Sequence, residues 1–125
     1  MKDLWSRLVL LAHDQVSSTI RSLPEDLRPH AEQLAVLFER VPSEAIVDGI
    51  LESDLLGLFV GDSLGVSSAD SGPLPRQILL FLENLWDFAE GDEEIFREEV
   101  QITFIHEFGH YLGLEEHELE ERGLL

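Results

Sequence analysis

The residues of this chain whose types and spacing could do chemistry lie close together near its C-terminus. His106, Glu107 and His110 form the pattern His-Glu-x-x-His, and Gly113 and Glu116 follow it. On a helix, positions i and i+4 lie one above the other, so two imidazoles at this spacing can bind one tetrahedral metal ion. The carboxylate next to the first histidine would then flank the open coordination position. The pattern is typical of a zinc hydrolase site.

A catalytic zinc ion usually has three protein ligands and one water, so a third ligand is needed. Position i+10 from His106 is Glu116, and His117 follows it. Gly113 permits a sharp turn after the helix, which would let a side chain about three residues later return to the metal. Spacing favours Glu116, because related extended motifs place their third ligand at that offset. His117 stays the alternative, since histidine is the commoner metal ligand.

Glu107 directly follows a ligand, so we assign it to proton transfer rather than to the metal. Its carboxylate would take a proton from a water on the metal, whose pKa the ion lowers to about 7, and pass it to the leaving amine. This is the chemistry of peptide-bond hydrolysis. Tyr111 is the only tyrosine, and we expect it to pack or to line the cleft rather than to stabilise the transition state.

The segment that precedes and contains the motif is apolar on most sides. A helix that is hydrophobic all round is buried, and polar side chains on it need partners. Three ionisable groups on one buried face would be costly without a cation, which favours a metal site over ordinary histidines. The apolar residues are Ile95, Phe96, Val100, Ile102, Phe104, Ile105 and Phe108.

Composition limits the partners of the protein. The chain has 125 residues and a formal net charge of −18, from 26 acidic and 8 basic residues. This charge disfavours nucleic acid and anionic membranes as partners, because affinity for phosphate comes from Lys and Arg. The chain has no cysteine, so zinc would have to be held by histidine, carboxylate and water.

The length and the hydrophobic pattern predict one domain over residues 1–125. No stretch approaches the length of a membrane-spanning helix, and the N-terminal residues lack the features of a signal peptide, so we expect a cytoplasmic protein. Periodicity predicts an amphipathic helix at 2–22 and a motif helix from an N-cap at Asp92 to Leu112, with Gly113 in the C-terminal cap. The other predicted elements are a short helix within 24–33, strands at 34–38, 55–60 and 78–81, a brief strand or helical turn at 46–47, a surface loop at 61–75, a helix at 83–89 and a last helical turn at 115–122.

The chain resembles the mini-zincins, a small bacterial family of zincin-like metallopeptidases. The extended motif HExxHxxGxxE carries the resemblance, together with Leu-Leu-Gly-Leu-Phe-Val-Gly at 55–61 and Leu-Pro-x-x-Ile at 74–78. The similarity covers about residues 41–125, whereas residues 1–24 form the additional N-terminal helix. The relatives have aspartate at the third ligand position, where this chain has Glu116.

This resemblance implies an α+β fold, a minimal zincin-like domain in which a small mixed β-sheet packs on the active-site helix. It implies one zinc ion per chain and a peptide or protein substrate. It also makes the strand at 78–81 a candidate cleft edge, where an extended peptide could add by strand pairing.

The leading hypothesis is a zinc metallopeptidase with ligands His106, His110 and Glu116 and with Glu107 as general base. A zinc-dependent endoribonuclease of the ribosomal-RNA-processing type would use the same ligand spacing. That family lacks the glutamate after the first histidine, and the negative charge gives RNA little to bind. A third hypothesis is a non-catalytic interaction module, in which zinc joins the motif helix to the C-terminal turn and contributes folding energy. The lack of an evident second catalytic donor keeps this reading open.

Overall fold

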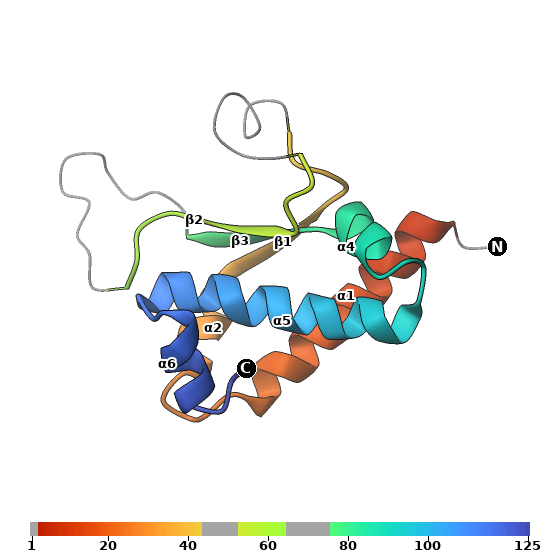
Figure 1. The fold of residues 1–125 in the computed structure, drawn as a ribbon. Helices are drawn as coiled ribbons and strands as arrows, with labels where there is room; N and C mark the ends of the chain where they lie inside the picture. The colour runs from red at the N-terminus through yellow and green to blue at the C-terminus, as the bar shows by residue number, and fades with distance from the viewer. Residues whose placement is uncertain (1–2, 44–52, 65–75) are drawn as a thin grey trace.

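A layer of helices packs against a small β-sheet in the computed structural model of the chain, which describes residues 3–43, 53–64 and 76–125 (Figure 1). The predicted α+β fold, with its small mixed sheet and its N-terminal helix, is confirmed. The brief element predicted at 46–47 and residues 65–75 of the predicted loop lie outside the described residues. The described elements, in chain order, are α1 (Leu4–Ser22), α2 (Arg28–Glu32), β1 (Ala35–Glu39), β2 (Gly57–Val60), β3 (Gln77–Phe81), α4 (Leu82–Phe88), α5 (Glu93–Leu112) and α6 (Glu116–Glu121).

The sheet has the strand order β1-β3-β2. Strand β3 pairs with β1 in parallel and with β2 in antiparallel orientation. The prediction that residues 78–81 form a cleft edge is therefore wrong, because β3 is the central strand. The reason is visible in its composition: Ile78, Leu79, Leu80 and Phe81 are all buried, and an apolar run without alternation is typical of a strand covered on both faces.

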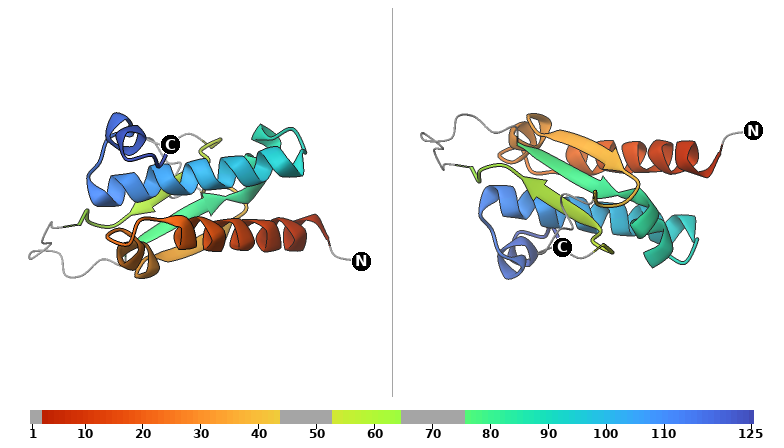
Figure 2. Two further views of the ribbon diagram at one scale, coloured as in Figure 1. Left: turned by 90° about the horizontal axis from the view of Figure 1, so that it is seen from below. Right: turned by 90° about the horizontal axis from the view of Figure 1, so that it is seen from above.

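Helices α1 and α5 lie side by side beneath the sheet and run in the same direction (Figure 2). Asp3 caps the N-terminus of helix α1, and its side chain accepts a hydrogen bond of 2.7 Å from the backbone N–H of Ser6. This hydrogen bond lowers the pKa of the Asp3 carboxyl. Its buried face repeats at helical spacing through Leu8, Ala12 and Val16. The N-terminal helix therefore forms one wall of the core, as its amphipathic pattern predicts.

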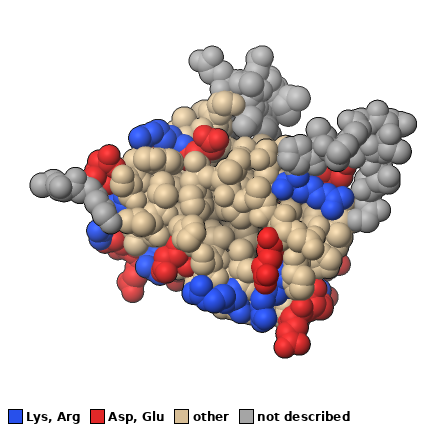
Figure 3. Space-filling view, turned by 180° about the vertical axis from the view of Figure 1, so that it is seen from behind, with Lys and Arg blue, Asp and Glu red and all other residues tan. Residues whose placement is uncertain are grey.

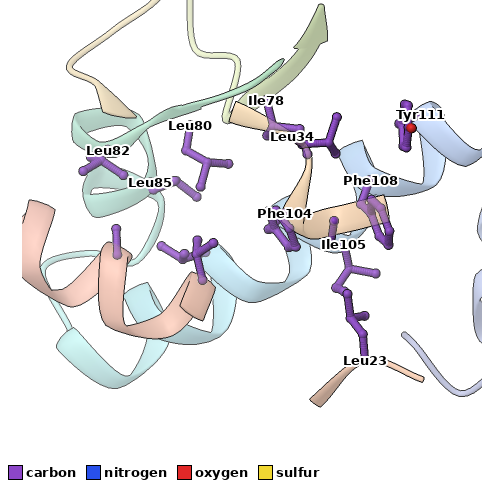
Figure 4. Packing of buried hydrophobic residues seen from close by; sticks show 14 of the residues in the cluster. Leu23, Leu34, Ile78, Leu80, Leu82, Leu85, Phe104, Ile105, Phe108 and Tyr111 are labelled. Atoms are coloured by element: carbon purple, nitrogen blue, oxygen red, sulfur yellow. The ribbon is translucent and has the colours of Figure 1, made fainter. Parts of the chain in front are cut away.

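The core lies between the sheet and these helices (Figure 4). Ile78 and Leu80 project from β3 toward α5, where Phe104 and Phe108 stack with ring centroids 6.0 Å apart. All four side chains have no exposed surface. Their burial fixes the rotation of α5 about its axis, and so decides which of its faces points away from the core.

Helix α5 has the predicted ends. Asp92 accepts a hydrogen bond of 3.0 Å from the N–H of Ile95, and Gly113 has the left-handed φ of 76° at the C-terminal cap. Most of the apolar residues expected to be buried on this helix are buried, but Ile95 is 42% exposed and Ile102 is 46% exposed. Among the elements that the structure describes, the sheet, α1, α4 and α6 pack on the other sides of α5, and none packs on the side of Ile95 and Ile102.

Ion pairs hold several of the arginines at the surface. Seen from behind, the molecule carries basic side chains interspersed with acidic ones (Figure 3). Each of these exposed pairs contributes little to stability. The pairs are Arg7 with Glu93, Arg40 with Glu83, Arg97 with Asp14 and Arg122 with Asp26.

No helix in the described segments is both long and apolar enough to cross a membrane.

Strand β2 approaches α5 closely at Gly57. A Cβ atom at this position would lie 2.6 Å from Thr103 Cγ2 and 3.2 Å from the carbonyl oxygen of Leu79. Real Cβ atoms do not make contacts as short as the first of these. Glycine is therefore required for the observed distance between the edge strand and the motif helix.

We expect Gly57→Ala to lower the free energy of unfolding by about 1–3 kcal/mol, the usual cost of an added methyl group in a packed site. Urea unfolding measures this change. Thr103→Ser removes the methyl group in the way, so the same substitution should cost less in a Thr103→Ser background. An equal cost in both backgrounds would contradict the proposed contact.

Candidate metal centre

Two histidines lie on successive turns of α5, next to the sheet. The ring centroids of His106 and His110 are 4.9 Å apart, with an angle of 72° between the ring planes. His106 is half-buried, and the side chain of His110 is 54% exposed. The structure thus brings together the two histidines that the motif singles out. The expected burial of all three ionisable groups is not observed, because one histidine faces solvent.

Glu107 is the buried group of the motif, with 8% of its surface exposed. Its Oε1 accepts a hydrogen bond of 2.9 Å from the backbone N–H of Phe59 in β2. The same oxygen lies 3.1 Å from Nδ1 of His110. In the tautomer that carries a hydrogen on Nδ1, the imidazole donates to Glu107 and leaves Nε2 free for a metal ion.

The contact with Phe59 could not be predicted from residue types, because every residue except proline has a backbone N–H. The one signal that could have indicated a contact here is Gly57 in the same strand, since glycine inside a strand often marks a close approach of another backbone. The consequence is that the edge strand fixes the carboxylate of Glu107.

The segment after β2 binds the C-terminal end of α5. The Ser63 hydroxyl donates to the carbonyl oxygen of His110 at 3.2 Å, and the N–H of Leu64 donates to that of Tyr111 at 2.7 Å. The last carbonyl groups of a helix have no partner within it, so these bonds stabilise the end that carries the second histidine. Two parts of one segment therefore contact α5: Phe59 bonds Glu107, and Ser63 and Leu64 bond the C-terminal end of the helix.

Tyr111 is 2% exposed and packs within the core. Its ring lies 5.6 Å from that of Phe59 and 6.2 Å from that of Phe108, between centroids. The guanidinium of Arg76 lies 5.6 Å from the centre of the Tyr111 ring. The prediction that this residue packs rather than acts on a substrate agrees with its position.

Glu116, the third predicted ligand, is the first residue of α6 and is exposed. Over the described residues, the group of three potential ligands whose donor atoms lie within 4.8 Å of one another is Glu115, His117 and Glu118. Glu116 is not in this group, and it is not gathered at that separation with the two motif histidines. His117 lies with its Nδ1 3.5 Å from Glu115 Oε2. The choice of third ligand therefore remains a prediction.

Helix α6 is positioned against the motif helix by a glycine within the motif. A Cβ atom at Gly109 would lie 2.7 Å from Cδ1 of Leu119. Leu119 is 1% exposed, so its side chain has little room to move. Gly109 thus allows the close packing that brings the segment around Glu116 beside the end of α5.

The donor atoms present suit a zinc ion. Imidazole nitrogens and carboxylate oxygens are ordinary zinc ligands, and the buried carboxylate of Glu107 orients His110 as partners of metal-binding histidines do. The hydrogen bond from Phe59 holds the carboxylate of Glu107 at β2, next to the two histidines.

The comparison with known families agrees with this geometry. A family model described as zincin-like metallopeptidase matches residues 31–124, and the chain belongs to this family. The match includes β1, which precedes the segment on which the resemblance in the sequence rests. A comparison with curated proteins finds no match. Family membership indicates a metal-dependent function of the peptidase type.

We expect Gly109→Ala and Leu119→Ala to be energetically coupled by about 1–3 kcal/mol, because the added methyl group occupies the volume of the leucine side chain. In the Leu119→Ala background the clash is gone, and alanine should stabilise the helix by about 1 kcal/mol through its higher helix propensity. A double-mutant cycle of urea unfolding measures the coupling. Additive effects would show that α6 does not pack on Gly109.

Proposed function

We propose that the protein is a zinc metallopeptidase that hydrolyses peptide bonds, with Glu107 as general base. The observation that carries this proposal is the buried carboxylate of Glu107 beside the paired imidazoles of His106 and His110. The zinc ligands would be these two histidines and Glu116, with one ion per chain. When bound, zinc supplies a water of lowered pKa and polarises the substrate carbonyl.

Glu107 is suited to proton transfer by its fixed position. Oε1 is engaged by the amide of Phe59 and faces Nδ1 of His110, so the carboxylate cannot rotate freely. Within the described residues, Oε2 has no hydrogen-bond partner, and it is the oxygen that would take a proton from the attacking water. The same carboxyl group would then return the proton to the leaving amine.

In the part of the chain that the structure describes, the edge strand next to this carboxylate is β2. The N–H of Phe81 donates to the carbonyl of Leu56 at 3.0 Å, and the antiparallel register pairs Leu58 with Leu79. Residues 56 and 58 therefore form the hydrogen-bonded positions, and the backbone groups of Gly57 and Phe59 point away from β3. The N–H of Phe59 is already donated to Glu107, so the backbone groups left for a peptide are those of Gly57 and the carbonyl of Phe59. An extended peptide would add at β2, and not at β3 as the sequence suggested.

The alternative of a non-catalytic zinc module keeps the same ligands but gives Glu107 only the role of orienting His110. The distance of 3.1 Å between the two residues favours keeping this alternative. An endoribonuclease is less favoured, because the net charge of −18 opposes RNA binding.

We expect purified protein to bind about one zinc ion per chain, and His106→Ala or His110→Ala to abolish stoichiometric binding, because each removes one of few ligands. Metal analysis after dialysis measures the stoichiometry. His13→Ala is the matched control, since His13 is an exposed histidine on α1, and it should retain the metal. In the same titrations, Glu116→Ala should weaken zinc binding more than His117→Ala. The opposite order would replace Glu116 by His117 as the third ligand.

We expect Glu107→Gln to keep zinc and the fold but to reduce peptide hydrolysis by about 10²–10⁴-fold, because the amide cannot accept the proton. The rate of cleavage of a peptide library, followed by mass spectrometry, measures this loss. Zinc content serves as the control for an intact site. Equal activity of the variant and the wild type would exclude Glu107 as base, and a wild type that cleaves nothing would favour the zinc module.

A further inference from the structure

A cavity of about 340 Å³ opens beside the metal motif, between β2 and α5. Residues 55–57 form one wall, and Ile102 and Thr103 form the other. His106 and Glu107 lie at its end, so a side chain bound there would place its backbone next to the candidate catalytic group. The walls are mainly apolar, and the one further charged residue that lines the cavity is Glu99.

Glu99 lies on the open face of α5. Ile95, Glu99, Ile102 and His106 are separated by four, three and four positions, and such spacing places them on one helical face. Ile95 and Ile102 are the exposed apolar residues of this face, at 42% and 46%. Glu99, which is half-buried, thus lies between two exposed isoleucines on the helical face that also carries His106.

Within the described residues, Glu99 forms no ion pair with Lys, Arg or His, and the basic group that shares its cavity is His106 of the motif. The ion pairs of Arg7, Arg40, Arg97 and Arg122 are all with other carboxylates. Of the residues outside the described ranges, 44–52 and 65–75 contain no Lys, Arg or His, and 1–2 contain Lys2. A neighbouring cavity of about 260 Å³, which shares Leu56, adds further acidic residues and no basic one.

An apolar channel with a carboxylate on its wall matches one type of side chain. Lysine and arginine have an apolar stem and a cationic end, so the stem can cover apolar surface while the charge reaches a carboxylate. A neutral aliphatic side chain would leave the half-buried Glu99 without a partner, and an acidic one would be repelled.

We propose that this cavity, the Glu99 pocket (residues 55–57, Glu99, Ile102 and Thr103), receives a lysine or arginine side chain of the peptide substrate. Glu99 is then a specificity-determining residue and does not take part in the chemical step. This inference rests on the proposed peptidase function, and it names the substrate class as basic peptides.

The test compares short capped alanine peptides that differ at one position, which is Lys, Arg, norleucine or Glu. For the zinc-loaded wild type, we expect kcat/KM to be about tenfold higher for the Lys and Arg peptides than for norleucine, and lowest for Glu. Glu99→Gln should remove most of this preference, and Glu99→Lys should reverse it in favour of Glu. Glu98→Gln removes the same charge from an exposed neighbouring position and should leave the preference unchanged.

Equal kcat/KM values for Lys and norleucine in the wild type, or an equal loss of preference in Glu98→Gln and Glu99→Gln, would overturn the proposal. Binding separates its failure from that of the proposed function. In zinc-loaded Glu107→Gln protein, NMR titration should show tighter binding of the Lys peptide than of the norleucine peptide, with shifts at Gly57 and Ile102. Selective binding without any cleavage by the wild type would support the pocket and reject the peptidase. Binding without selectivity would reject the pocket.

Discussion

The close contact between β2 and α5 is the constraint on which the candidate site depends. With glycine at position 57, the strand lies against Thr103, and two residues later the N–H of Phe59 reaches Glu107. A larger residue would separate the two elements and leave a carboxylate in the interior without its backbone donor, which is costly. The packing of one strand on one helix therefore decides both the burial and the orientation of the proposed base.

The packing of β2 on α5 also affects which face of α5 is accessible to solvent. Because α5 is covered by the sheet, α1, α4 and α6, its remaining face is open along Ile95, Ile102 and His106. Gly57 of the edge strand β2 lines one cavity together with Ile102 and His106 of this face. A buried carboxylate, an exposed imidazole and an open strand edge thus meet at one place, which suits a site that must hold a fixed base and still admit a chain. A purely structural metal site would need no such opening.

Much of the fold follows from local signals in the sequence. The N-cap at Asp92 and the glycine at 113 set the ends of α5 as predicted, because capping depends on a few neighbouring residues. The apolar runs at 34–38, 55–60 and 78–81 predict the three strands, although not their order. The strand at 78–81 was wrongly expected at a cleft edge, because strand pairing is a contact between distant segments; the continuous burial of β3 explains its central place.

The sequence by itself determined the identity of the motif residues and their placement on one helix. The spacing of four between His106 and His110 brings two imidazoles together on one face only if the segment is helical. Only the tertiary structure decided how each residue is used. It buried Glu107 and left His110 exposed, because the rotation of α5 is set by Phe104 and Phe108 against β3. It also supplied the amide of Phe59, a partner that carries no residue-specific signal and is found only when the chain is folded.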